Sequence, residues 1–139
     1  DMLKRDIFDK LSSLKDIIAF IDDKKGTVFT ETFERIKSRI ESLLVDDPNR
    51  DRIYQEAAIY AEKVDIEEEV TRIKSHISHF QKIVDKEFPV GKKLDFMCQE
   101  LYREFNTIGS KSGNTDIINM VVEGKNIVDK LREQVQNIV

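Results

Sequence analysis

The sequence predicts an all-α protein, with a long antiparallel helical hairpin followed by a helical bundle and about six helices in total. Apolar residues recur every three or four positions along almost the whole chain, which is the period of an α-helix. Only five glycines and two prolines occur among the 139 residues, and 36% of the residues are charged. This composition is typical of helices with solvated charged faces.

The hairpin is predicted over residues 1–47. Its first helix ends at the polar run 22–26, because Gly26 is a suitable residue to follow a helix. Its second helix begins near residues 27–30 and ends before Pro48. A short connection between two long helices predicts antiparallel partners, and the heptad spacing of both apolar seams predicts packing like that of a coiled coil.

The bundle is predicted over residues 48–139. A helix over about residues 48–63 is apolar on several sides, which indicates a central position. The next helix begins at the capping residue Asp65, and the run 89–91 separates it from the helix that follows.

The last predicted helix is capped by Asn114 or Thr115, and its apolar seam runs from Ile117 to Ile138. Gly124 falls on this seam, where a glycine costs roughly 0.5–1 kcal/mol relative to alanine. Close approach of a neighbouring backbone and simple tolerance both explain a glycine there.

Composition and motifs exclude several classes of function. The formal net charge of −4 gives no overall attraction to nucleic acid, so any basic surface must be local. The single Cys98 forms no intrachain disulfide, which fits a reducing cytosol, and we interpret it as a packed, inert thiol. No apolar run is long enough for a transmembrane helix, and no nucleotide-binding loop or zinc motif is present.

Two predicted helices carry more hydrogen-bonding side chains than an exposed face requires. The first has a stripe of carboxylates, an arginine and imidazoles at helical spacing. Carboxylates with imidazole can hold a divalent ion or share a proton transfer, and ion pairs such as Glu68 with Arg72 are the alternative. The stripe comprises Asp65, Glu68, Glu69, Arg72, His76 and His79.

The second such helix has two polar rows beside its apolar seam. One row is Gln99, Arg103 and Asn106, and the other is Glu100, Glu104, Thr107 and Lys111. An arginine here can bind a phosphate through two hydrogen bonds, and a glutamate can activate water. A buried polar network joining helices or subunits is the alternative.

The stretch FNTIGSKSGNTD, residues 105–116, continues these rows into a turn. Its hydroxyls, amides and lysine lie next to the start of the last helix, where anions are attracted. Phosphate binding and internal capping of the turn would use the same side chains.

Three separated motifs carry a resemblance to a known family. The runs AEKVDIEEEVTRIKSH, GKKLDFMCQELYREFNTIGSKS and REQVQNIV resemble the C-terminal half of the YicC/YloC family of bacterial proteins, and the likeness covers essentially the whole chain. In the family an α/β domain precedes these helices, and we expect it to be missing from these 139 residues. Phe105 stands where the family commonly has alanine, and Gly124 replaces a larger apolar residue, so side-chain volume suggests that the two compensate.

The resemblance implies an endoribonuclease that acts on single-stranded RNA and depends on a divalent metal, Mn²⁺ or Mg²⁺. It also implies a cytoplasmic homo-oligomer, with a hexameric ring as the expected assembly, and neither a membrane nor DNA as a partner.

Our hypothesis assigns roles to individual residues of these motifs. Phosphates and the RNA strand would be held by Lys92, Lys93, Arg103, Asn106, Ser110, Lys111 and Ser112. Glu100, Glu104 and Asp95 would act as base, with Glu100 and Glu104 as candidate metal ligands and His76 as a proton donor. The alternative is an oligomerisation or RNA-binding module without catalysis of its own, whose active site needs the N-terminal domain.

Overall fold

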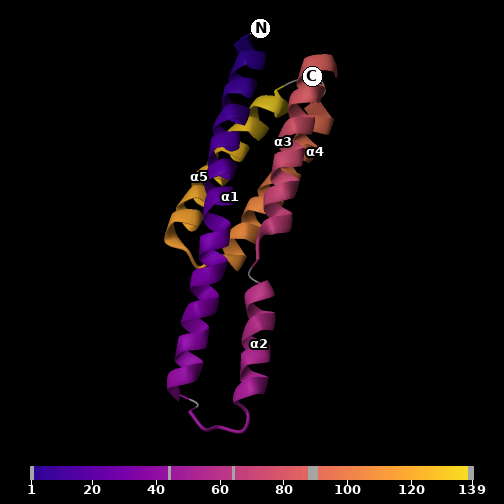
Figure 1. Ribbon diagram of the computed structural model, residues 1–139. Coiled ribbons are helices and arrows are strands. Elements are labelled where there is room, and N and C mark those ends of the chain that lie inside the picture. The colour runs from indigo at the N-terminus through magenta and orange to yellow at the C-terminus, as the bar shows by residue number, and fades with distance from the viewer. Residues whose placement is uncertain (1, 44, 64, 88–90, 138–139) are drawn as a thin grey trace.

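The computed structural model describes residues 2–43, 45–63, 65–87 and 91–137. These residues form five α-helices and no strand, so the all-α class is confirmed (Figure 1). Most of the connection predicted at 89–91, and Ile138 at the end of the last seam, lie outside the described residues. The helices are α1 (Met2–Leu43), α2 (Arg50–Lys63), α3 (Glu67–Glu87), α4 (Gly91–Lys111) and α5 (Thr115–Gln136).

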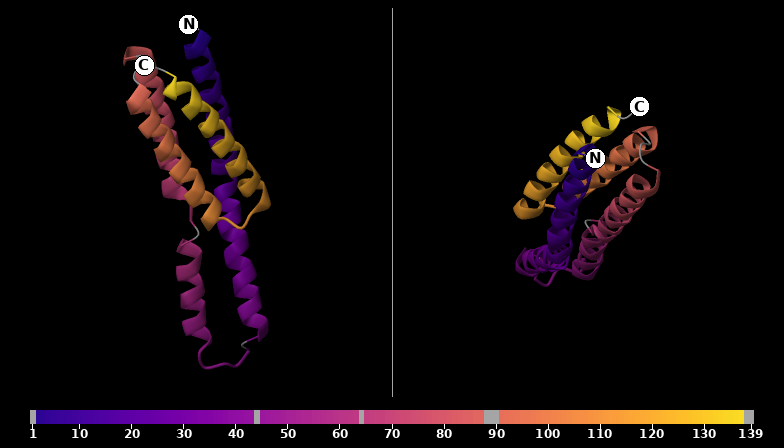
Figure 2. Two further views of the ribbon diagram at one scale, coloured as in Figure 1. Left: turned by 180° about the vertical axis from the view of Figure 1, so that it is seen from behind. Right: turned by 90° about the horizontal axis from the view of Figure 1, so that it is seen from above.

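A four-helix bundle forms from the first half of α1 together with α3, α4 and α5 (Figures 1 and 2). Its core is one cluster of apolar side chains that come from all four helices, with Phe80 and Phe105 as the largest fully buried members. The apolar seams predicted from the helical period supply this cluster. Burial of these seams is the main source of the bundle's stability.

The helix boundary predicted at residues 22–26 is wrong. The described residues therefore form five helices, where the sequence predicts about six. Helix α1 continues through Gly26 as one element of 42 residues. A hairpin does form, but between the second half of α1 and α2, with a turn in which Asp46 has a φ of 68°. We call this hairpin, residues 27–63, the arm; it projects beyond one end of the bundle (Figure 1).

The charged run at 22–26 continues as helix because its side chains pair with other helices. The Asp22 carboxylate accepts hydrogen bonds from Lys25 and from Lys74 of α3, which lower the pKa of Asp22. Lys25 Nζ also lies 3.1 Å from a carboxylate oxygen of Glu67 at the start of α3. The run therefore ties the middle of α1 to α3.

The central position predicted for the helix at 48–63 is also wrong. Among the principal helix contacts, α2 packs on α1 alone, and none of the α2 side chains that the structure describes belongs to the core cluster. Ile59 and Tyr60 are each 54% exposed. The apolar residues of α2 thus face partly into solvent on the arm.

The predicted compensation between Phe105 and Gly124 is confirmed at the contact of α4 with α5. A Cβ atom at Gly124 would lie 2.8 Å from both Cε1 and Cζ of the Phe105 ring. The ring occupies the space that a side chain on α5 would need. The glycine therefore permits the close approach of a large side chain rather than of a backbone.

Candidate functional site

A network of charged side chains joins the start of α3 to the end of α4; we call it the Arg72 network. It consists of two buried carboxylates, Glu69 at 1% and Glu104 at 8% exposure, and two cations, Arg72 and Lys111. Arg72 Nε donates to Glu104 Oε1 at 2.9 Å, which raises the pKa of Arg72. Its Nη2 lies 3.3 Å from Glu69 Oε2, and Lys111 Nζ donates to Glu69 Oε1 at 2.6 Å.

Burying a carboxylate is costly unless it is paired and hydrogen-bonded, and both buried glutamates meet that condition. The ion pair predicted between Glu68 and Arg72 is also present, at 3.5 Å. The structure thus places Glu104 and Lys111, two of the predicted site residues, in an ion-paired contact between helices.

Several polar side chains of the stretch 105–116 bond to the backbone. Asn114 Oδ1 accepts from the backbone N–H of Ile117 at 3.0 Å and so begins α5. Ser112 Oγ is buried and accepts from the N–H of Asn114 at 3.2 Å. Ser110 Oγ donates to the carbonyl oxygen of Thr107 at 3.0 Å. Internal capping therefore accounts for much of this polar stretch.

Two further candidates, His76 and Glu100, lie at the same level of the antiparallel helices α3 and α4. The two helices are antiparallel, and Arg72 of α3 meets Glu104 of α4. One helical turn further from this pair are His76 on α3 and Glu100 on α4. Both are partly buried, and a carboxylate oxygen of Glu100 lies 3.6 Å from Arg103 Nη1. The antiparallel register thus puts the His76 imidazole at the level of the Glu100 carboxylate, which is paired with the Arg103 guanidinium.

Asp95 lies apart from these residues because it faces α5 rather than α3. Its Oδ1 accepts from Arg132 Nε at 2.8 Å, which raises the pKa of Arg132, and its Oδ2 accepts from Gln99 at 3.1 Å. The structure therefore does not bring Asp95 together with Glu104. No role is predicted for Arg132 from the sequence, although it begins the third motif, REQVQNIV, which was the available signal.

A groove of about 490 Å³ runs between α4 and α5, and we call it the α4–α5 groove. The row Gln99, Arg103 and Asn106 lines its α4 side, as the helical spacing predicts. Tyr102 also lines the groove, and Lys125 Nζ lies 5.0 Å from the centre of its ring. The remaining lining residues are Cys98, Val128, Asp129 and Arg132.

The predicted phosphate-binding lysines are not gathered into one patch. Lys92 and Lys93 are exposed in the first turn of α4. Lys111 ends the same helix, about 28 Å away along its axis. A ligand that contacts both ends would have to follow the length of α4.

The described residues do not offer a donor set that fits a divalent metal. No group of three or more His, Cys, Asp or Glu among them is placed to hold such an ion. Glu104, one of the two candidate ligands, already accepts a hydrogen bond from Arg72. A metal ion would need donors from outside the described part of the chain.

We expect Cys98 to react slowly with iodoacetamide in the folded protein. Burial, with a smaller contribution from Asp95, raises the pKa of its thiol to about 12, so the reactive thiolate is scarce at pH 8. Mass spectrometry of samples alkylated with and without urea measures the two rates. Equal rates in native and unfolded samples would contradict the buried, protonated thiol.

The helical bundle and its three motifs place the chain in a known class. The family described as "Endoribonuclease YicC-like, C-terminal" matches residues 21–139, and the chain belongs to this family. It is 44% identical to a protein named probable endoribonuclease YicC from Clostridioides difficile (strain 630), over 98% of this chain and 47% of that protein. A protein of the same name from Haemophilus influenzae (strain ATCC 51907 / DSM 11121 / KW20 / Rd) is 42% identical, over 76% of this chain and 36% of that protein. The chain thus spans less than half the length of these curated relatives.

Among the described residues, no helix has the length and apolar character needed to cross a membrane.

Proposed function

We propose that this region works as the C-terminal part of a longer cytoplasmic endoribonuclease that hydrolyses phosphodiester bonds of single-stranded RNA. Membership of the family and the names of both relatives support an enzyme that cuts RNA. The observation that carries the proposal furthest is a set of polar side chains on α4 whose hydrogen bonds and ion pairs with described residues stay within that helix, namely Gln99, Glu100, Arg103 and Asn106. They flank the buried seam on both sides, in the α4–α5 groove and beside α3.

In this proposal the α4–α5 groove holds the RNA strand. Arg103 is exposed on its rim, and a guanidinium can bind a phosphate through two parallel hydrogen bonds. Gln99 and Asn106 offer amide groups on the same side, and Tyr102 lines it as well, with Lys125 Nζ 5.0 Å from the centre of its ring. Lys92 and Lys93 extend the basic surface towards the start of α4.

The proposed chemistry uses Glu100 and His76. The Glu100 carboxylate takes a proton from the attacking water, and the His76 imidazolium gives a proton to the oxygen that leaves from phosphorus. Arg103, 3.6 Å from Glu100, balances the charge that develops on the phosphate. A requirement for Mn²⁺ or Mg²⁺ also belongs to the proposal, with donors from beyond the described residues.

We expect Glu100→Gln to reduce RNA cleavage by about 10²- to 10⁴-fold, because the amide cannot accept a proton. RNA binding should be retained, since the substitution removes a negative charge and little volume. The assay uses a labelled single-stranded RNA with Mn²⁺ or Mg²⁺ and an EDTA control. It is run on the 139-residue chain and on a form of the relatives' length.

The matched control is Glu123→Gln, which makes the same change at an exposed position of α5. Full activity of Glu100→Gln, or equal losses in both variants, would remove Glu100 from the mechanism. Cleavage by the longer form alone would mean that catalysis also needs residues outside this chain.

The alternative proposal is an assembly module without catalysis of its own, and exposed apolar side chains on the arm favour it. A pocket of about 270 Å³ on α1 is lined by Ile36, Arg39, Ile40 and Leu43, and Leu43 is 71% exposed. A homo-oligomer, with a hexamer as the proposed assembly, would cover such surface. Light scattering on the Glu100→Gln sample measures the mass of the oligomer and separates the two proposals. A changed oligomer mass with RNA cleavage retained supports the assembly module.

A further inference from the structure

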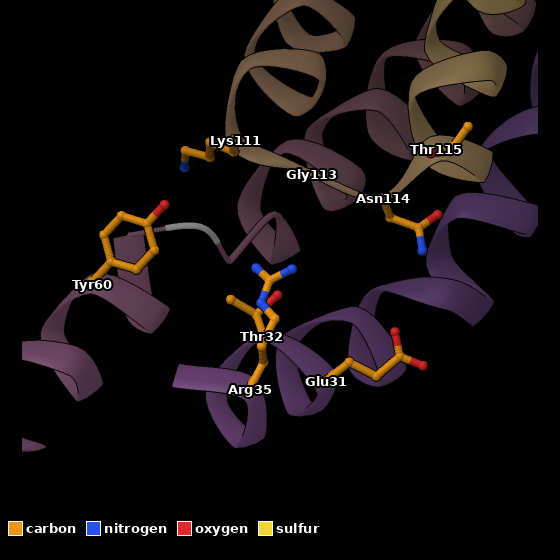
Figure 3. Close-up of a pocket in the computed structure, with 8 residues that line it drawn as sticks. All are labelled: Glu31, Thr32, Arg35, Tyr60, Lys111, Gly113, Asn114 and Thr115. Atoms are coloured by element: carbon orange, nitrogen blue, oxygen red, sulfur yellow. The ribbon is translucent and has the colours of Figure 1, made fainter. Parts of the chain in front are cut away.

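A separate pocket of about 430 Å³ opens where the arm meets the bundle; we call it the arm pocket (Figure 3). Segments far apart in the sequence form its walls: the middle of α1, the end of α2 and the turn from α4 to α5. It is distinct from the α4–α5 groove, with which it shares no lining residue. Its lining residues are Glu31, Thr32, Arg35, Tyr60, Lys111, Gly113, Asn114 and Thr115.

The arm pocket holds polar groups that the fold itself does not use. The guanidinium of Arg35 and the hydroxyl of Tyr60 make no hydrogen bond or ion pair with the described residues. Lys111 donates to Glu69 and to the backbone oxygen of Asp65, which leaves one of its three ammonium hydrogens for another acceptor. The Arg72 network differs, because there both buried carboxylates are satisfied by cations of the chain itself.

The chemistry of these walls selects the ligand. Two cations favour a phosphate, and the partly exposed ring of Tyr60 offers a face on which an aromatic base can stack. Figure 3 shows the Glu31 carboxylate on the opposite side of Arg35 from Tyr60 and Lys111. Arg35, Lys111 and Glu31 give the lining a net charge of +1, and the pairing of Lys111 with Glu69 offsets part of the positive charge, so the pocket suits one phosphate better than a polyphosphate.

We propose that the arm pocket binds one nucleotide, with its phosphate between Arg35 and Lys111 and its base against the ring of Tyr60. The volume lies within the range of about 300–1,000 Å³ that is usual for small-molecule sites. The nucleotide is either one unit of an RNA strand or a free nucleoside monophosphate. Only the first source rests on the proposed function. Lys111 lies about 16 Å along α4 from Glu100, so a strand anchored here would continue towards Glu100.

Titration calorimetry with adenosine monophosphate tests the pocket in the longer form of the protein, with inorganic phosphate as a second probe. Arg35→Gln should weaken adenosine monophosphate binding by about tenfold or more, because a charged hydrogen-bond donor is lost. Arg39→Gln is the matched control, since Arg39 lies one turn further along α1, is exposed and does not line the arm pocket. Tyr60→Leu should reduce the affinity for adenosine monophosphate to that for phosphate.

A short single-stranded RNA distinguishes the sources. Weaker binding of both RNA and adenosine monophosphate by Arg35→Gln supports a site for the RNA strand. Loss of adenosine monophosphate alone supports a free nucleotide as ligand. Absence of saturable adenosine monophosphate binding at millimolar concentration, or equal effects of Arg35→Gln and Arg39→Gln, overturns the pocket. Because this readout is binding, it is independent of whether Glu100→Gln abolishes cleavage.

Discussion

Replacing Arg72 with methionine is expected to lower the free energy of unfolding by clearly more than the loss of an exposed surface arginine does. Methionine keeps much of the side-chain volume but leaves the buried Glu104 carboxylate without its cation. Glu69 keeps its bond from Lys111, and Arg72 itself is about half exposed, so the loss should be at the lower end of the range for buried ion pairs. Urea unfolding followed by circular dichroism measures the change.

The matched control is Arg103→Met on α4. The Arg103 side chain is 73% exposed and 3.6 Å from Glu100, so its loss should cost at most about 1 kcal/mol. The double variant Arg72→Met with Glu104→Met should recover most of the stability, because both charges are then gone. A single variant as stable as the control would show that the Arg72 network contributes little to folding.

Gly124→Ala is expected to destabilise the protein by about 1–3 kcal/mol, although alanine is the better helix former. The added methyl would lie 2.8 Å from two atoms of the Phe105 ring, which is fully buried and has little room to move. Gly26→Ala is the control, since nothing lies within 4 Å of a Cβ there. Its expected effect is a gain of about 0.5–1 kcal/mol, because Gly26 is inside α1.

A double-mutant cycle tests whether Phe105 and Gly124 share one space. Phe105→Ala alone should cost about 3–5 kcal/mol. Adding Gly124→Leu should restore part of this loss, because the leucine fills the volume that the ring leaves. Thermal unfolding of the four proteins gives the coupling. Additive effects would mean that the ring and the glycine do not compensate each other.

The features that the sequence predicts correctly depend on local chemistry. Helical seams follow from the period of apolar residues, and caps follow from short side chains that reach a nearby backbone N–H. Asp65 accepts from the N–H of Glu67 at 3.0 Å, and Asn114 caps α5 as expected. The pairing of Phe105 with Gly124 is predictable because Phe105 is larger, and Gly124 smaller, than the residues that the family commonly has at these positions.

The features that the sequence does not predict depend on which distant side chain meets which. The run 22–26 has the composition of a helix end, but its partners Lys74 and Glu67 are on another helix. The helical spacing of the apolar residues in α2 predicts that this helix packs against another element. It does not predict that the partner is the part of α1 that lies outside the bundle.

The same limit applies to the candidate site. Helical spacing predicts each row of α4 but not that Asp95 faces α5 while Glu104 faces α3. Arg35 and Tyr60 carry no local signal at all. They belong to one pocket because the arm brings α1 and α2 to the turn between α4 and α5.

The continuity of α1 makes the number of its residues a constraint on both ends of the molecule. The helix is about 63 Å long, and each residue turns it by about 100°. Insertion of one residue near Gly26 would leave all existing side chains in the sequence. It would nevertheless rotate the arm relative to the bundle by about 100° and so move Arg35 away from Lys111. Insertion of seven residues would turn the helix by about 700°, close to two full turns, so it would leave nearly the same helical face in place but lengthen α1 by about 10 Å. Angular phase, as well as composition, is therefore under constraint in α1, whereas the turn around Asp46 can change in length without altering the phase of α1.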